Sequence, residues 1–331
     1  MKFGLFGGAR AKQSGPSGDS QGYGDFIAYV QAAERLGFQS VFLVEHHFTG
    51  FAQVSASLTL LSYLAACTRT IRLGTAVVVL PWHNPVLVAE AAATLDLLSG
   101  GRLDFGVGKG YRDYEFSGFC VPIDEATERF DEAIAVIRKS WTMPGRFSHH
   151  GKRWHFDDIV VEPAPVQRPH PPFWLGAGSA PSIRRAAREG YNLLLDQIGS
   201  TDLTIERVAI FRDECVQAGR PYDPMMVGVT RGLQLVRSAE ERQKALATRT
   251  QVIKNIGALA RGPGAERYTD PGSYAATEDD APLLGTPEEI IARLKRLEAG
   301  GVGYVLLVDP APAAATLAAF AQEIMPALVG R

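Results

Sequence analysis

The chain has 331 residues, a formal net charge of −2, 46% hydrophobic residues and 21% charged residues. This composition is typical of a soluble globular enzyme, and the absence of a Lys/Arg cluster argues against a nucleic-acid partner, because phosphate binding needs concentrated positive charge. No apolar run is long enough to span a bilayer, and the start MKFGLF resembles a strand more than a signal peptide, so we expect a cytoplasmic protein with no membrane partner.

Short β-rich segments alternate with helical segments along the whole chain. We expect strands at residues 2–6, 41–45, 71–80, 103–108, 173–176, 192–195, 226–236 and 304–308. Helices are predicted between them, one with Asn84 as its N-cap and one that opens with a capping box at Thr286 and Glu289. Eight βα units in series favour an α/β fold of the (β/α)8 TIM-barrel type with insertions over an open sheet.

The chain is longer than a minimal barrel. A typical barrel has roughly 250 residues, so we expect about 80 residues in insertions. We place an inserted hairpin at residues 146–165 and a mobile lid loop at residues 262–284, which are rich in Gly, Pro, Ser and Asp. No linker divides the sequence, so we predict a single domain over residues 1–331.

Cys67, Cys120 and Cys215 are widely spaced and form no CxxC pair. This pattern predicts free thiols in a reducing compartment, without a zinc site or a disulfide framework.

The unusual polar and glycine-rich residues follow the predicted strands. Glu45-His46-His47 ends the second strand, GVGKGYR (106–112) follows the fourth, GAGSAPS (176–182) follows the fifth, and Asp196-Gln197 follows the sixth. Active sites of such barrels form at the C-terminal ends of the strands. We therefore expect a functional site at this rim.

The GAGSAPS segment joins a strand to a helix start. Backbone N–H groups at a helix N-terminus bind anions, and glycines allow close approach, so Ser179 and Ser182 could help to hold a phosphate. The alternative is that Ser179 only caps the helix. Lys109 at the neighbouring strand end favours the phosphate site, and we predict a phosphate-bearing cofactor.

The GVGKGY segment matches GxGxxG incompletely. We expect no ordered helix to open at its end, and the spacing to an acidic residue does not fit a βαβ unit. We therefore reject a dinucleotide site, and with it a permanent NADPH module.

Glu45-His46-His47 allows three interpretations. Metal ligation is the weakest, because adjacent residues of an extended segment point to opposite sides and no further ligand motif stands nearby, so no metal site is predicted. A histidine can also be a hydrogen-bonded part of the barrel wall. A histidine at a strand end, with a pKa near the working pH, can instead transfer protons. We favour catalysis for His46 and a structural role for His47.

Several longer segments are similar to a known family. MKFGLF at the start, LVEHHFTGF (43–51), RLGTAVVVLPWHNPVLVAE (72–90), LLSGGRLDFGVGKGYRDYEFSGF (97–119), FWLGAGSAPSIRRAAREG (173–190) and LLGTPEEIIARL (283–294) closely resemble bacterial luciferase-like flavin-dependent monooxygenases, of the luciferase alpha-subunit type. The resemblance covers nearly the whole chain in the expected order. It implies a TIM barrel that binds reduced FMN at its C-terminal rim, usually as a homodimer packed through its early helices.

The resemblance also implies roles for individual residues. His46 matches the catalytic histidine and Glu45 a flavin-pocket acid. Ala76 and Val77 match a cis peptide beneath the isoalloxazine ring. Among the remaining cofactor-binding positions, Lys109 matches a phosphate-binding arginine and Tyr111 matches a flavin contact. Gln197 stands where an indole packs. The phosphate loop of the family is matched by Gly178, Ser179, Ala180 and Ser182.

Three positions depart from the family pattern. Lys109 replaces a bidentate arginine, Gly108 stands where luciferase has a cysteine, and Gln197 replaces a tryptophan. These changes widen or repolarise the flavin pocket, so neither light emission nor a long-chain aldehyde substrate is implied.

The expected function is that of a two-component monooxygenase. A separate NAD(P)H:flavin reductase would supply reduced FMN, which reacts with O2 to give a flavin 4a-hydroperoxide that oxygenates a small organic substrate in a closed, dry site. The alternatives are a deazaflavin-dependent hydride-transfer oxidoreductase with the same barrel, and a flavin-binding protein without activity. The sequence leaves the substrate and the type of oxygenation open.

Overall fold

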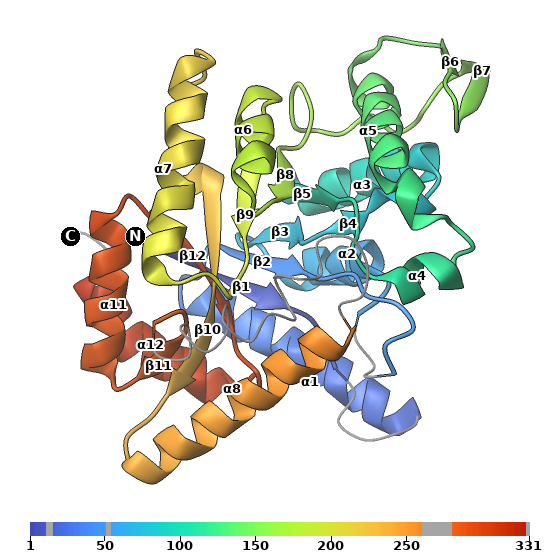
Figure 1. The fold of residues 1–331 in the computed structure, drawn as a ribbon. Helices are drawn as coiled ribbons and strands as arrows, with labels where there is room; N and C mark the ends of the chain where they lie inside the picture. The colour runs from blue at the N-terminus through green and yellow to red at the C-terminus, as the bar shows by residue number, and fades with distance from the viewer. Residues whose placement is uncertain (11–15, 51–53, 260–279, 329–331) are drawn as a thin grey trace.

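Parallel strands close into a barrel in the computed structural model, which describes residues 1–10, 16–50, 54–259 and 280–328. The barrel strands within these ranges are β1 (Lys2–Gly7), β2 (Ser40–Leu43), β3 (Arg72–Thr75), β5 (Leu103–Gly108), β8 (Phe173–Gly176), β9 (Asn192–Leu195), β10 (Val227–Leu235) and β12 (Tyr304–Val308). Each pairs in parallel with the next, and β12 pairs with β1 (Figure 1). The predicted (β/α)8 TIM barrel is confirmed.

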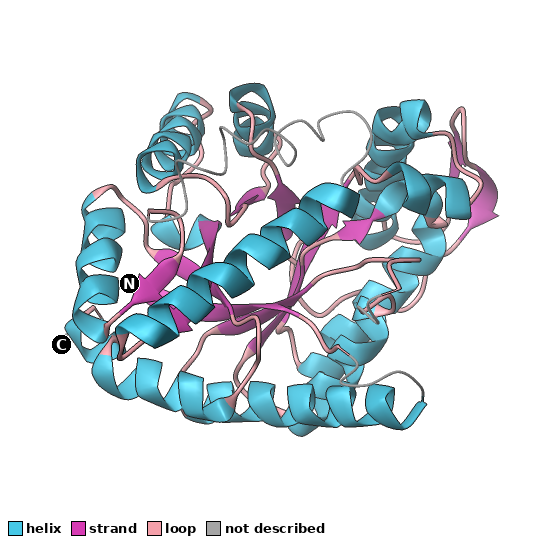
Figure 2. Ribbon diagram, turned by 60° about the horizontal axis from the view of Figure 1, so that its bottom comes forward, coloured by secondary structure: helices cyan, strands magenta, loops and turns pink. Residues whose placement is uncertain are grey.

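Helices surround the strands, as Figure 2 shows. They are α1 (Pro16–Arg35), α2 (Ser57–Cys67), α3 (Pro85–Ser99), α4 (Asp113–Gly118), α5 (Ala126–Thr142), α6 (Ala180–Arg188), α7 (Thr201–Gln217), α8 (Ala239–Leu259), α11 (Pro287–Ala299) and α12 (Ala314–Glu323). Asn84 caps α3 and the Thr286–Glu289 capping box opens α11, as predicted. In the described residues no helix is both long and apolar enough to cross a membrane.

The predicted third strand is interrupted. Strand β3 ends at Thr75, the short strand β4 (Val78–Val79) pairs with the end of β5, and a 3-10 helix (Leu80–Trp82) follows. Pro81 in that helix has no N–H to donate to a strand ladder. The second strand also ends early, at Leu43, so Glu45 and His46 lie in the loop after β2 rather than in the strand.

The expected insertions differ in how far the structure describes them. Strands β6 (Phe147–His150) and β7 (His155–Ile159) form an antiparallel hairpin, whose turn is held to α5 by Glu132, which accepts from the backbone N of Trp154 at 2.7 Å. Residues 262–279 lie outside the described residues. The end of the predicted lid range is not a loop: β11 (Leu283–Gly285) pairs with β10, because its two leucines are buried in the core.

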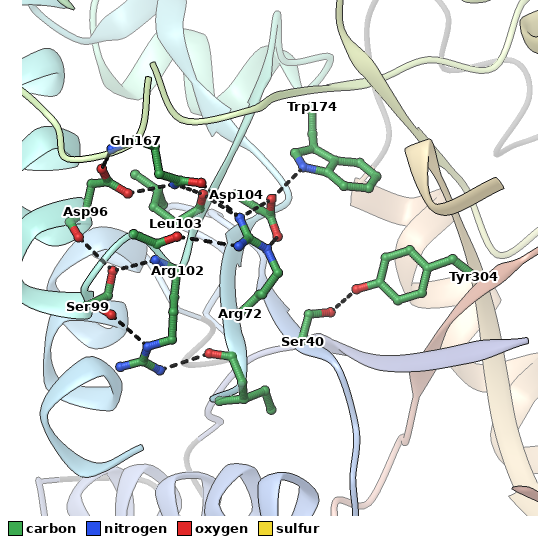
Figure 3. Close-up of polar contacts among 12 residues, drawn as sticks. Ser40, Arg72, Asp96, Ser99, Arg102, Leu103, Asp104, Gln167, Trp174 and Tyr304 are labelled. Carbon is green, nitrogen blue, oxygen red and sulfur yellow. Dashed lines mark hydrogen bonds and ion pairs between the residues drawn. The ribbon is translucent and has the colours of Figure 1, made fainter. Parts of the chain in front are cut away.

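Polar contacts fill the barrel interior near the N-terminal ends of the strands (Figure 3). Asp104 accepts from Arg72 Nε at 2.7 Å and from Trp174 Nε1 at 3.1 Å. Ser40 and Tyr304 are hydrogen-bonded to each other. Apolar side chains, among them Phe42, Leu194 and Leu306, pack with Trp174 in the interior. The interior is therefore filled, and the site must lie at the opposite, C-terminal rim.

Candidate active site at the barrel rim

Glu45 is the centre of a buried hydrogen-bond network. Its Oε1 accepts from His83 Nε2 at 2.7 Å, His47 Nε2 at 3.0 Å and Trp82 Nε1 at 3.1 Å, while Oε2 accepts from the backbone N of Val79 at 3.3 Å. Burial disfavours the ionised carboxylate, but the hydrogen bonds from His47, His83 and Trp82 outweigh it and lower the pKa of Glu45 to about 2. Glu45 is thus ionised near pH 7, and it ties the loop after β2 to the segment after β4.

His46 is held by a second carboxylate. Glu115 on α4, only 2% exposed, has its Oε1 3.1 Å from His46 Nδ1 and 2.9 Å from the backbone N of His47. Arg112 lies 3.7 Å from the same oxygen. Burial lowers the pKa of His46 and nearby Arg112 lowers it further, whereas the hydrogen bond and charge of Glu115 raise it. The net shift is downward, so His46 is neutral near pH 7.

Aromatic rings form a wall beside these residues. The ring of Phe119 lies 4.7 Å from that of His47 and 5.2 Å from that of Trp82, and Phe48 packs on Phe119 at 5.0 Å. His47 is therefore both hydrogen-bonded and packed, which fits the structural role favoured for it. Phe48 is exposed, so the wall extends an apolar surface towards solvent.

The segment between β3 and β4 packs closely against β5 below the rim. The Thr75 hydroxyl bonds both the N and the O of Gly106, at 2.8 and 2.7 Å, and a Cβ at Gly106 would lie 1.8 Å from the Thr75 carbonyl oxygen. The Ala76–Val77 peptide is cis, as the resemblance implied. A Cβ at Gly108 would lie 2.4 Å from Val77 Cγ2. Gly106 and Gly108 thus allow the backbone of Thr75 and the side chain of Val77 to approach β5. Close packing therefore explains these two glycines, which superficially resemble part of a GxGxxG motif.

One expectation about this segment is wrong. A short helix, α4, does begin directly after GVGKGYR, at Asp113. Two of its side chains, Glu115 and Phe116, are buried. The helix has only six residues, and its buried acid binds His46.

The predicted phosphate loop opens α6. Ser179 occupies the N-cap position but makes no side-chain capping bond; its Oγ lies 2.8 Å from the Oγ of Ser182. The first turn of α6 carries no acidic residue. Gly178 and Ala180 flank Ser179 in the same loop, which is largely exposed. The structure therefore does not contain the alternative arrangement, in which the side chain of Ser179 only caps the helix.

Lys109 leaves the barrel next to this loop, since Val107 of β5 pairs with Leu175 of β8. Its Nζ donates to Thr127 Oγ1 at 3.2 Å, and within the described ranges it forms no ion pair. A phosphate would find an accessible cation, two hydroxyls and a helix N-terminus here, so this part of the rim fits the phosphate of FMN.

Two predicted residues lie on either side of this region. Tyr111 contacts the guanidinium of Arg112, whose carbon is 5.4 Å from the ring centre. Gln197 follows β9 and is partly buried. All the predicted residues therefore lie at one end of the barrel. The carboxylate–histidine network follows β2, whereas the predicted phosphate loop follows β8.

Sequence reasoning missed several contacts. From the sequence, no partner was assigned to Glu115 or to His83. Both bind Glu45-His46-His47 from segments far along the chain. The only signal was their position just after strands that end at the same rim.

Known proteins are similar to this chain over most of its length. The family model described as luciferase-like monooxygenase matches residues 1–303. The oxygenase component of a flavin-dependent trigonelline monooxygenase from Acinetobacter baylyi is 27% identical over 349 residues, covering 99% of this chain and 95% of the relative. An FMNH2-dependent dimethylsulfone monooxygenase from Pseudomonas putida is 29% identical over 300 residues, covering 84% and 80%.

A solved structure shares the whole architecture. The monooxygenase RslO1 from Streptomyces bottropensis superposes with a TM-score of 0.85 at 26% identity, covering 98% of this chain and 99% of that chain.

Proposed function

Because this chain belongs to the luciferase-like monooxygenase family, we propose that it is the oxygenase component of a two-component monooxygenase. It would take reduced FMN from a separate NAD(P)H:flavin reductase and use O2 to oxygenate a small organic substrate. The relatives that act on trigonelline and dimethylsulfone support this proposal. The observation that carries it is His46, held by the buried carboxylate of Glu115 at the same rim at which Ser179 and Ser182 open α6.

The chain's own groups would hold FMN. Ser179, Ser182 and the first amides of α6 would bind its phosphate, with Lys109 as the counter-charge. Val77, which covers Gly108 and approaches Gly176, would support the ring system from below. When bound in its reduced form, the cofactor supplies the electrons that activate O2.

His46 would transfer a proton in the reaction. The hydrogen bond to Glu115 engages Nδ1, so Nε2 is the nitrogen that takes up or delivers a proton. Because burial lowers the pKa of His46, the ring is neutral at pH 7 and acts first as a base. Glu115 then stabilises the imidazolium that forms.

The aromatic wall would keep water away from this step. Phe48, Trp82 and Phe119 surround the polar network of Glu45 and His47 with rings. Excluding water strengthens the electrostatic interactions inside the site and suppresses side reactions of activated oxygen.

We also propose a homodimer. On α3, Leu87, Ala91, Thr94 and Leu98 lie on one stripe at spacings of four, three and four residues, and all four are exposed. Leu87 and Leu98 are each 63% exposed. An uncharged exposed stripe on an early helix supports packing against a second copy. The free thiols of Cys67, Cys120 and Cys215 support a reducing, cytoplasmic location.

Two rival functions make different predictions about binding. A hydride-transfer enzyme would prefer a reduced deazaflavin, and a non-catalytic protein would bind oxidised and reduced FMN alike. Anaerobic titration of the protein with reduced FMN, oxidised FMN and the reduced deazaflavin separates the three. We expect reduced FMN to bind about tenfold or more tightly than the other two; a preference for the deazaflavin would replace the proposal.

A further inference from the structure

Arg112 is a buried cation next to the pair formed by His46 and Glu115, and only 3% of this residue is exposed. It occupies the N-cap position of α4, and its carbonyl oxygen accepts from the backbone N of Glu115 at 3.0 Å. Residues three positions apart lie on one face at a helix start, so the first turn of α4 places the guanidinium beside the carboxylate. Taking a charge out of water is costly, so the burial of Arg112 indicates a role for its partners.

The guanidinium lies near Glu115 without a hydrogen bond to it. Arg112 Nη1 is 3.7 Å from Glu115 Oε1, which is longer than a hydrogen bond. The same nitrogen donates to the hydroxyl oxygen of Tyr114 at 2.9 Å. Arg112 therefore acts on Glu115 through its charge, whereas this N–H group is engaged by the tyrosine.

This separation matters because Glu115 Oε1 already has two other partners. It lies 3.1 Å from His46 Nδ1 and 2.9 Å from the backbone N of His47. An arginine commonly binds a carboxylate directly, through two parallel N–H···O bonds. Such a contact would bring guanidinium N–H groups to the oxygen that binds His46. With Nη1 held by Tyr114, Oε1 keeps its bonds to the histidine ring and to the chain.

Two tyrosines contact the guanidinium. Its carbon lies 5.4 Å from the ring centre of Tyr111, and Tyr114 accepts its N–H group. Burial raises the pKa of the Tyr114 hydroxyl, although the charge of Arg112 opposes this shift, so the hydroxyl is neutral near pH 7. Burial lowers the pKa of Arg112, but Tyr111, Tyr114 and Glu115 together raise it above its usual value. Arg112 is therefore charged near pH 7.

We propose that Arg112 and Tyr114 are positioning residues for proton transfer by His46. Tyr114 holds the guanidinium of Arg112 away from a direct hydrogen bond to Glu115, so the carboxylate stays bonded to His46 while the charge of Arg112 acts on the pair. The inference rests on the proposed function, since it takes His46 as the residue that transfers the proton.

The two residues should have opposite effects on proton uptake by His46. The charges that face His46 are Glu115 and Arg112 from α4 and its N-cap, and Glu45 from the loop after β2; the carboxylates favour uptake and Arg112 opposes it. Loss of the Arg112 charge should therefore move uptake to higher pH. Loss of the Tyr114 hydroxyl frees Nη1 to bond to Glu115 Oε1, where it competes with His46, so uptake should move to lower pH.

The test is an NMR titration of the His46 ring, which needs neither flavin nor turnover. The signal is identified by its loss in His46→Gln. We expect an upward shift of about one pH unit in Arg112→Gln and a smaller downward shift in Tyr114→Phe. Arg112→Lys, which keeps the charge, should titrate closer to the wild type than Arg112→Gln. In the double variant Tyr114→Phe should add nothing to Arg112→Gln, because the tyrosine acts through the guanidinium.

Arg129→Gln is the matched control. Arg129 is a partly buried arginine that pairs with Glu125 at 2.8 Å, so its loss should leave the titration of His46 unchanged. The proposal is overturned if Arg112→Gln does not shift the titration upward, or if Tyr114→Phe has the same effect with and without Arg112. If Arg112→Gln does not fold, Tyr114→Phe decides: a downward shift supports the proposal and an unmoved titration overturns it. Failure of the monooxygenase proposal would appear separately, as absence of a reduced-FMN reaction with O2 in the wild type, and would leave these titrations as expected.

Discussion

Glu115 Oε1 lies 3.1 Å from His46 Nδ1 and 2.9 Å from the backbone N of His47. One carboxylate oxygen therefore fixes both the ring of His46 and the path of the chain that carries it. This arrangement defines the tautomer of His46, because an ionised carboxylate accepts the Nδ1 proton and leaves Nε2 to act as a base.

Glu115→Gln should lower the pKa of His46. The charge and hydrogen bond of Glu115 raise that pKa against burial and Arg112, so their removal leaves the lowering effects unopposed. In NMR titrations the His46 ring signal should change at lower pH than in the wild type, and the acid limb of kcat should move the same way. Glu125→Gln removes a carboxylate that pairs with Arg129 and Arg153 and should change neither. An unmoved His46 titration would show that Glu115 has only a structural role.

Substitutions of His46 and His47 should affect different properties, turnover for His46 and stability for His47. His46→Gln should reduce substrate oxidation about 10²- to 10⁴-fold, as loss of a general acid–base does, while FMN affinity changes little. His47→Gln should instead lower thermal stability, because His47 donates to buried Glu45. Reductase-coupled product formation, calorimetric FMN titration and melting curves of the two variants check this. Equal losses of turnover with unchanged stability in both would contradict the division of roles.

The phosphate loop should distinguish FMN from riboflavin. Ser182→Ala and Lys109→Gln should each weaken FMN binding by about tenfold, since each removes a hydrogen bond to a doubly charged group. Riboflavin has no phosphate, so its affinity should stay unchanged. Lys152→Gln, on an exposed lysine that pairs with Glu128, should affect neither ligand. Fluorescence titration measures all the affinities, and equal effects on both flavins would place the phosphate elsewhere.

Acid should weaken the contribution of Glu45 to stability. Its pKa falls from 4.5 to about 2 on folding, which corresponds to about 3 kcal/mol of stability from the ionised form. This contribution is complete above about pH 4.5 and is lost as the pH falls towards about 2. The difference in unfolding free energy between wild type and Glu45→Gln should therefore be large at pH 7 and shrink at pH 3. Urea unfolding at both pH values measures it, and a constant difference would contradict the account.

The exposed stripe on α3 should control assembly. Leu98→Glu places a charge in the proposed dimer contact and should produce monomers in sedimentation velocity. Leu203→Glu, on the exposed surface of α7, should leave the assembly unchanged. A wild-type protein that sediments as a monomer would remove the dimer from the proposal.

The sequence was sufficient for the barrel because each strand is a short apolar run followed by a helix with a recognisable start, as at Asn84 and Thr286. It placed Glu45 and His46 at the correct rim. It could not assign Glu115 to His46, because that contact depends on how α4 turns back over the strand ends.

Rapid mixing of the protein and reduced FMN with oxygenated buffer tests directly whether this chain is a flavin-dependent monooxygenase. We expect a transient absorbance that outlasts the oxidation of free reduced FMN, and that decays much faster or fails to form in His46→Gln. If the flavin reoxidises at the same rate with and without protein, this chain is not an FMN-dependent monooxygenase.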